Sequence, residues 1–359
     1  MRVLITILTA LVAATAIASA VPPPRPTNYP RSYDDLIASA EREGTLTVYS
    51  NIDTPEAAPV LDGFRRRYPG IRLVYVDLPA NELFRRFVSE TDARKPSADL
   101  LVSSAMDLQI KLINDGYAQT YASPEKPALP PAAVWKNQGY GITAEPIAIA
   151  YNRKLLPDAR APRTHAALTA WLVRERARLQ GRVATFDPAR SGVGYLYLQQ
   201  DLATTLDTWS LLGALAATKP LLSNRSEDMI DGVASGHFVL AYNVIGSYAL
   251  ERARHAPELG VIFPSDYTLT MSRIGLIPAQ APHPSVAKLF LDYLLSRPGQ
   301  TLLAQRSLSP IRPDVGAAIS RPTPAGAAPI RVGPQLLANL DPIKHQHFLR
   351  RWAKVQKQN

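Results

Sequence analysis

The amino-acid sequence predicts an α/β fold in which mainly parallel sheets are flanked by helices. Two observations lead to this fold class: short apolar segments rich in β-forming residues alternate with longer amphipathic segments from Thr45 onward, and polar or Gly-Pro turns separate them. A third observation is size, because 359 residues of which 46% are hydrophobic can form the cores of two domains.

The first half of the chain shows the alternation most clearly. Residues 46–51 are typical of a strand that leads into a polar turn, and Pro55 lies where a helix would have its first turn. Pro69-Gly70 ends this helix before a strand at 71–78. The expected helices lie at 55–68, 81–91 and 105–115, with a buried strand at 98–104.

The second half repeats the pattern. Strands are expected at 145–152, 181–187 and 237–243, and two extended segments over 261–278 flank a turn at Pro264-Ser265-Asp266. Helices are expected at 162–176 (capped by Thr164), 247–255, 283–295 and 334–357. Residues 21–32 and 313–333, rich in Pro and small side chains, predict loops.

Residues 1–20 predict an export signal. Arg2 precedes an apolar run over residues 3–17, and Ala18-Ser19-Ala20 fits cleavage by signal peptidase after Ala20. The run is shorter than the roughly 18–20 apolar residues that a membrane span requires. We therefore expect a soluble mature chain of 339 residues (359 minus 20) in the periplasm. An uncleaved membrane anchor is the alternative.

Composition and motifs limit the kinds of functional site and partner that the chain is expected to have. The chain has no cysteine, which excludes a catalytic thiol, a cysteine metal site and a disulfide. Its net charge of +10 would suit nucleic acid, an anionic membrane or an anionic small ligand, but the basic runs are short and typical of solvated helix faces. Ser123-Pro-Glu-Lys126 matches only one fragment of a penicillin-binding motif, and no G-x-S-x-G, H-E-x-x-H or P-loop occurs. We expect no enzyme, cofactor, metal site or nucleic-acid partner.

Four strand-to-helix junctions share one chemical character. They are Ser50-Asn51, Ser103-Ser104, residues 187–194 around Ser191-Gly192, and residues 242–248. Each places hydroxyls, an amide or glycine where free backbone N–H groups and the positive end of a helix dipole meet. Because ligands of open α/β sheets bind outside the carboxyl ends of the strands, the four junctions predict one shared anion-binding cleft. A plain helix cap is the alternative at each junction.

The order of these segments resembles a known family. The stretches LTVYSN (46–51), FRRRYPGIRLVYV (64–76), SADLLVSSAMDLQIKLINDGY (97–117), EPIAIAYNRKLLP (145–157), SGVGYLYLQQD (191–201), HPSVAKLFLDYLLSRPGQTLLA (283–304) and SLSPIRPDV (307–315) resemble the extracellular solute-binding proteins of ABC importers. The branch that they resemble includes receptors for ferric iron, hexose phosphates and phosphonates. Residues after about 334 extend beyond the common core.

This resemblance implies a two-lobed type II periplasmic-binding-protein fold. Two crossing strands, near 141–150 and 267–277, would join the lobes and act as the hinge for closure around the ligand. Lobe one would comprise residues 21–144 and 268–359, and lobe two residues 145–267. The implied partners are a small ligand and an ABC permease of the inner membrane, and we expect a monomer.

The residues at the four junctions favour an anion over iron. Ferric-binding relatives carry an adjacent Tyr-Tyr pair after the strand equivalent to 237–243, whereas this chain reads Tyr242-Asn243-Val244 there. We therefore expect an organophosphate, a phosphonate or a carboxylate as the ligand, with a ferric-iron receptor as an alternative. The expected ligand contacts are Ser50, Asn51, Ser103, Ser104, Ser191, Gly192, Val193 (through its N–H), Asn243 and Ser247.

Several roles stay open from sequence alone. Arg190 and Arg273 are candidates for pairing with the ligand's charge, or for surface and structural roles, and Tyr242 and Tyr248 belong either to the core or to the cleft wall. A sensory protein that reports to a membrane kinase would have the same fold. A secreted enzyme is the third class and would turn its substrate over.

Overall fold

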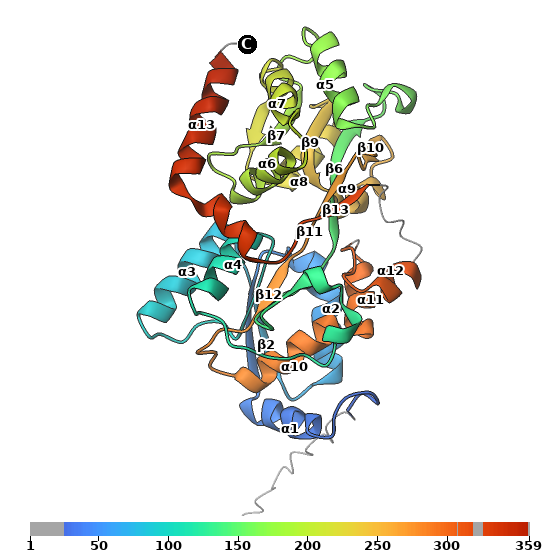
Figure 1. Ribbon diagram of the computed structural model, residues 1–359. Coiled ribbons are helices and arrows are strands. Elements are labelled where there is room, and N and C mark those ends of the chain that lie inside the picture. The colour runs from blue at the N-terminus through green and yellow to red at the C-terminus, as the bar shows by residue number, and fades with distance from the viewer. Residues whose placement is uncertain (1–24, 307, 319–325, 358–359) are drawn as a thin grey trace, which may run out of the picture.

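Two β-sheets, one in each lobe, organise the computed structural model of the chain, and helices cover both (Figure 1). The structure describes residues 25–306, 308–318 and 326–357, so the expected export signal at 1–20 lies outside the described residues. No helix in these ranges is long and apolar enough to cross a membrane.

The sheet of lobe one is mixed. Its strand order is β2 (Arg72–Asp77), β1 (Thr45–Ser50), β3 (Leu100–Ser103), β12 (Ile274–Leu276), β5 (Gly139–Gly141) and β4 (Val134–Trp135). The pairs β1–β2 and β1–β3 are parallel, whereas β12 runs antiparallel to β3 and β5. The helices of this lobe are α1 (Tyr33–Glu43), α2 (Thr54–Arg67), α3 (Ala80–Asp92), α4 (Met106–Asn114), α10 (Pro284–Leu295), α11 (Arg297–Ala304) and α12 (Pro313–Ala318), with short turns η1 (Lys126–Ala128) and η2 (Pro131–Ala133).

The sheet of lobe two is also mixed. Its order is β13 (Ala327–Pro329), β11 (Thr268–Met271), β6 (Glu145–Asn152), β9 (Leu240–Ile245), β7 (Val183–Phe186) and β8 (Leu221–Ser223), and β10 (Leu259–Ile262) pairs with β6. Its helices are α5 (His165–Arg174), α6 (Gly192–Thr204), α7 (Thr208–Ala216), α8 (Ser226–Ala234), α9 (Gly246–Ala253) and α13 (Pro342–Lys357), with the turn η3 (Asp158–Arg160). Parallel pairs occur at β7–β8, β7–β9 and β11–β13, whereas β6 pairs antiparallel with β9, β10 and β11.

Local sequence signals explain many of the element boundaries. Gly44 ends α1 with a left-handed φ of 65°, a conformation that favours glycine. Thr164 caps α5, because its Oγ1 accepts a hydrogen bond from the backbone N–H of Ala167 at 3.0 Å, as expected from the sequence. The strand residues Leu46 and Val48 alternate with more exposed neighbours and are buried in the core of lobe one.

Two strands cross between the lobes. β5 in the first sheet is followed closely by β6 in the second, and β11 in the second sheet is followed by β12 in the first. β6 and β11 pair antiparallel through Thr270 with Pro146 and Met271 with Glu145. Figure 1 shows both strands running from one lobe into the other. These strands span residues 139–152 and 268–276, and the resemblance implies crossings near 141–150 and 267–277.

The C-terminal segment corrects one expectation. Sequence analysis expected a single helix over 334–357 and placed the whole segment in lobe one. The turn η4 (Pro334–Leu340) does pack against α4 of lobe one, but α13 packs against α7 of lobe two (Figure 1). Phe348 and Trp352 on α13 are buried in the core of lobe two. Pro342 lacks an N–H and Asp341 accepts a hydrogen bond from the N–H of Ile343, so the chain breaks there and starts a new helix.

Candidate functional site

A cleft lies between the lobes at the carboxyl ends of their parallel strands. Its volume is about 580 Å³, and residues from the turn after β1, the end of β2, α3 and the β3–α4 junction of lobe one face residues from α6, α8 and α9 of lobe two. The first residues of α3, α6 and α8 all line this cavity. Helix starts carry N–H groups without intrahelical partners, so the cleft presents several partial positive charges.

The junction at Ser191 supplies the most complete anion-binding geometry. Ser191 caps α6, because its Oγ accepts a hydrogen bond from Gly194 N at 3.0 Å. Gly192 and Val193 follow in the first helical turn, and all three residues line the cleft. The hydroxyl proton of Ser191 and the N–H groups of this first turn are the donors that this arrangement provides to an oxyanion.

Gly192 also marks the place where the lobes approach each other. A Cβ added to Gly192 would lie 3.3 Å from Oδ1 of Asn81, which belongs to α3 of lobe one. Asn81 lines the same cleft. A small residue at 192 therefore lets the second lobe's helix start come close to the first lobe across the cleft.

Asn51 and Ser104 form the corresponding floor on lobe one. Asn51 Nδ2 donates to Ser104 Oγ at 2.6 Å, and the Ser104 N–H donates to Asn51 Oδ1 at 3.0 Å. They follow the neighbouring strands β1 and β3, and both line the cleft. The structure thus brings together five of the nine expected contacts: Asn51, Ser104, Ser191, Gly192 and Val193.

The other four expected contacts do not line this cleft. Ser50 and Ser103 are buried, and each hydroxyl accepts a hydrogen bond from a backbone N–H two residues later, Ile52 and Ala105 respectively. Asn243 donates to the buried carboxylate of Asp201 at 2.9 Å, and Ser247 donates to Glu145. Ser50 and Ser103 therefore stabilise turns, and Asn243 and Ser247 belong to buried hydrogen-bond networks.

Arg273 has a structural role at the crossing. It is 1% exposed, and its Nε donates to Glu145 Oε1 at 2.8 Å. Its other guanidinium nitrogens donate to the Asn51 carbonyl at 2.9 Å and to the Tyr248 hydroxyl at 3.0 Å. The carboxylate of Glu145 neutralises the charge of Arg273. Arg273 therefore stabilises the cleft floor and the crossing between the lobes.

Three other arginines bring positive charge to the cleft: Arg85, Arg190 and Arg225. Within the described part of the chain, the side chains of Arg85 and Arg190 have no ion pair or hydrogen bond. Arg225 Nε lies 3.7 Å from Glu227 Oε2. Arg190 sits in a tight turn in which the N–H groups of Arg190 and Ser191 donate to the Asp187 carbonyl, at 3.2 and 2.8 Å.

Sequence analysis missed a fifth junction of the same character. Ser223-Asn224-Arg225-Ser226 follows the short strand β8 and starts α8, and residues 224–227 line the cleft. The run Ser-Asn-Arg-Ser is typical of a polar turn and could have indicated this junction. In the structure, Ser223 Oγ accepts a hydrogen bond from the N–H of Arg225. With only three residues, β8 is too short to show periodicity. Tyr248 lines the cleft, whereas Tyr242 is buried and donates to Asp201.

Neither the cleft nor the rest of the described chain resembles a metal centre. No group of three or more His, Cys, Asp or Glu side chains is placed to hold a metal ion within the described residues. Tyr248 is the one tyrosine among the described cleft-lining residues, and its hydroxyl already accepts from Arg273. Four carboxylates, Asp53, Asp77, Glu82 and Glu227, also line the cleft, but among the described residues they form no such group. The phenolate and carboxylate ligands that ferric iron prefers are therefore not gathered at one point there.

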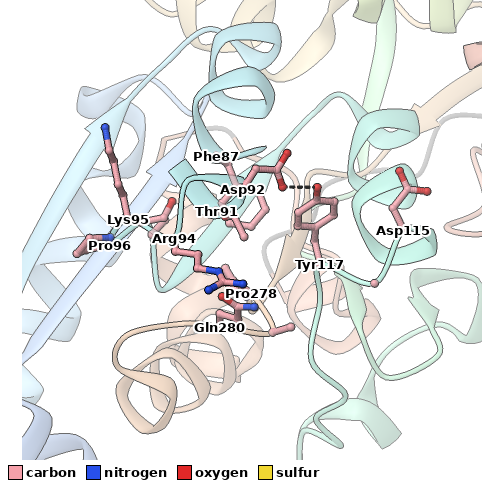
Figure 2. A pocket seen from close by; sticks show the side chains of 14 residues that line it. Phe87, Thr91, Asp92, Arg94, Lys95, Pro96, Asp115, Tyr117, Pro278 and Gln280 are labelled. Carbon is pink, nitrogen blue, oxygen red and sulfur yellow. Dashed lines mark hydrogen bonds between the residues drawn. The ribbon is translucent and has the colours of Figure 1, made fainter. Parts of the chain in front are cut away.

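A second cavity, of about 490 Å³, lies at the opposite edge of lobe one (Figure 2). It is formed by the C-terminal ends of α3 and α4, the loop before β3 and the segment after β12. Tyr117 donates to Asp92 at 2.8 Å on its wall, and Arg94 points toward Gln280. Helix C-termini carry partial negative charge, so this cavity is a poorer anion site than the cleft.

Replacing Ser191 with alanine separates the two functions of this residue. Loss of the cap lowers the free energy of unfolding by about 1 kcal/mol. Loss of a hydrogen bond to a charged ligand costs about 1.5–3 kcal/mol, so affinity falls roughly tenfold or more. Calorimetric titration beside thermal melting checks both effects. A lowered melting temperature with unchanged affinity would reduce Ser191 to a helix cap.

Comparisons with known proteins agree with this architecture. The sequence profile of the family "Bacterial extracellular solute-binding protein" matches residues 60–328. A substrate-binding protein of an ABC transporter from Agrobacterium tumefaciens shares 37% identity over 87% of this chain and 94% of its own, with a TM-score of 0.80. A search of curated protein sequences found no match.

More distant solved structures share the fold. Iron-bound HitA from Pseudomonas aeruginosa is 19% identical, with a TM-score of 0.66 over 87% of this chain and 99% of its own. AfuA from Actinobacillus pleuropneumoniae, with fructose-6-phosphate bound, is 18% identical, with a TM-score of 0.68 over 88% and 99%. The profile match and the Agrobacterium relative show that this chain belongs to the bacterial extracellular solute-binding proteins that serve ABC transporters.

Proposed function

We propose that this chain captures a small anionic solute in the cleft between its lobes and delivers it to an ABC permease. The observation that carries this proposal is the Ser191–Val193 helix start, which faces the cleft beside Arg190, whose guanidinium has no partner among the described residues. Neutral N–H and hydroxyl donors together with one arginine bind phosphate, phosphonate or carboxylate oxygens well. In this proposal the chain is exported to the periplasm and its signal peptide is cleaved after Ala20.

A ligand screen tests this function. A thermal-shift panel of sugar phosphates, phosphoglycerates, phosphonates and carboxylates is expected to contain at least one strong stabiliser. A ligand at 100 times its dissociation constant adds about 2.7 kcal/mol to the free energy of unfolding. The purified protein should return that ligand chemically unchanged. A purple tyrosinate–iron absorption band after iron loading, without a response to any anion, would contradict the proposal.

We also propose that the lobes close about the two crossings. In this proposal lobe one spans residues 21–144 and the chain from 268 to η4, and lobe two spans 145–267 together with α13. Hinges of this kind concentrate the angular change in a few residues between rigid bodies. Small-angle scattering should show a smaller radius of gyration with the stabilising anion than without it. An identical profile at proven saturation would indicate a rigid receptor.

A receptor that reports to a membrane kinase would use the same cleft. The arrangement of donors is common to both roles, so transport and sensing differ in the partner that recognises the closed form. Uptake of the stabilising anion by cells that carry or lack this protein distinguishes them, because only a transport role makes uptake depend on the chain.

A further inference from the structure

The C-terminal segment, residues 327–357, passes from lobe two to lobe one and back again (Figure 1). Its first strand, β13, pairs with β11 in the sheet of lobe two, and the N–H of Ile330 donates to the carbonyl of Thr270 at 2.8 Å. The N–H of Val332 then donates to the carbonyl of Ala132 in lobe one at 3.0 Å. Next, η4 packs against α4 of lobe one, and α13 packs against α7 of lobe two. This segment therefore connects the lobes in addition to the crossings at β5–β6 and β11–β12.

Apolar side chains anchor the segment on both lobes. On lobe one, Leu336 of η4 is fully buried. On lobe two, Phe348 and Trp352 of α13 are each 4% exposed, and the ring centre of Phe348 lies 5.2 Å from that of Trp209 on α7. Pulling either anchor out of its core exposes large apolar surface to water, which costs free energy. We therefore expect η4 and α13 to stay packed on their own lobes when the lobes move.

The link between these two anchors is too short to stretch. η4 ends at Leu340 and α13 begins at Pro342, so Asp341 alone separates them. Asp341 is itself held at the start of α13, because its Oδ1 accepts from the N–H of Ile343 at 2.8 Å and its carbonyl accepts from the N–H of His345 at 3.0 Å. Two successive Cα steps span at most about 7 Å. The lobes can turn about this point, but they cannot separate there while both anchors stay packed.

The start of α13 also contacts the segment that carries the proposed anion site. His345 Nε2 lies 3.3 Å from the carbonyl oxygen of Pro188, and the ring centres of His345 and Tyr195 lie 4.3 Å apart. Pro188 and Tyr195 stand on either side of the Ser191 helix start in the sequence. The part of lobe two that this link holds near lobe one is therefore the part that supplies the expected contacts Ser191–Val193.

We propose that residues 327–357 act as a strap that limits how far the lobes open when no ligand is bound. The crossing strands β6 and β11 pair with each other, so they form a hinge at one place, and such a hinge by itself sets no limit on the opening angle. The link at Asp341 is a second attachment and supplies that limit. The inference rests on the proposed hinge motion and does not depend on the identity of the ligand. Because apparent affinity falls with the fraction of receptor outside the binding-competent arrangement, the strap keeps the cleft ready for its ligand.

Lengthening the link tests this proposal without removing either anchor. The sequence Gly-Gly-Ser-Gly-Gly-Ser is inserted between Leu340 and Asp341, which adds about 20 Å of reach when the insert is extended. The matched control carries the same insert between Pro69 and Gly70, an exposed turn that joins α2 to β2 within lobe one. The control lengthens the chain by the same amount and leaves every connection between the lobes intact.

The opening of the lobes is measured as a distance between two spin labels. The chain has no cysteine, so Ser89→Cys on α3 and Ser210→Cys on α7 place one label on each lobe, both at exposed positions. Pulsed electron paramagnetic resonance of the ligand-free protein gives the distribution of this distance. The insert in the strap is expected to lengthen the mean distance by several ångströms and to broaden the distribution, whereas the control matches the protein without an insert. Detachment of α13 in the strap variant breaks the link as well, so it leads to the same expected result.

Two results would overturn the strap. One is the same distribution in all three proteins, and the other is equal widening by both inserts, since the change then has nothing to do with the link. The measurement uses no ligand and is therefore separate from the anion screen. A widened distribution together with no response to any anion supports the strap and contradicts the proposed anion-binding function alone.

Discussion

Replacing Arg273 with methionine is expected to lower the free energy of unfolding by about 3–5 kcal/mol. Glu145 is fully buried and accepts hydrogen bonds from Arg273, from Thr143 at 2.8 Å and from Ser247. Without the guanidinium, Glu145 becomes an unpaired buried charge that must take up a proton or draw in water. The Asn51 carbonyl and the Tyr248 hydroxyl lose a donor at the same time. Urea unfolding followed by circular dichroism measures the loss.

Two further variants make this test specific. Arg65→Met removes a surface ion pair whose side chains are 46% and 53% exposed, and such pairs contribute about 0–1 kcal/mol. The double variant Glu145→Met/Arg273→Met should recover much of the stability, because it removes both buried charges together. A loss below 1 kcal/mol for Arg273→Met alone would show that Glu145 does not depend on this arginine.

Reversing the charge of Arg190 should weaken anion binding at least a hundredfold. The variant Arg190→Glu exchanges a cation beside the Ser191 helix start for a carboxylate that repels the ligand, and a hundredfold corresponds to about 2.7 kcal/mol. Arg160→Glu, on an exposed turn of the same lobe, is the matched control and should keep the affinity. Calorimetric titration with the anion found in the screen measures both. Equal affinities for the two variants would remove Arg190 from the site.

Strand geometry explains why two neighbouring polar residues at one junction have different roles. The sequence analysis assigned both members of Ser50-Asn51 and of Ser103-Ser104 to the ligand. Successive side chains of an extended chain point to opposite sides, so one member of each pair faces the cleft and the other turns into the protein. The structure places Asn51 and Ser104 in the cleft and uses Ser50 and Ser103 in turns. Alternation alone could have predicted one contact from each pair.

Other features depend on partners that are distant in the sequence. Ser247 donates to Glu145 across 102 residues, and Arg273 pairs with Glu145 across 128. Such pairings follow from tertiary packing, which a local pattern does not encode. The position of α13 also follows from tertiary packing, since Phe348 and Trp352 lie in the core of lobe two and the helix packs against α7. Helix α1 was not among the expected helices, although Gly44 and the apolar spacing before it indicate a helix that ends there.

Native mass spectrometry of protein purified without refolding tests the central claim most directly. The account predicts that the unmodified chain retains one small organic anion, and that Arg190→Glu prepared in parallel carries none. The mass of the retained compound also constrains its elemental composition. A ferric ion as the only adduct, or the same compound retained equally by Arg190→Glu, would contradict an anion site between the lobes.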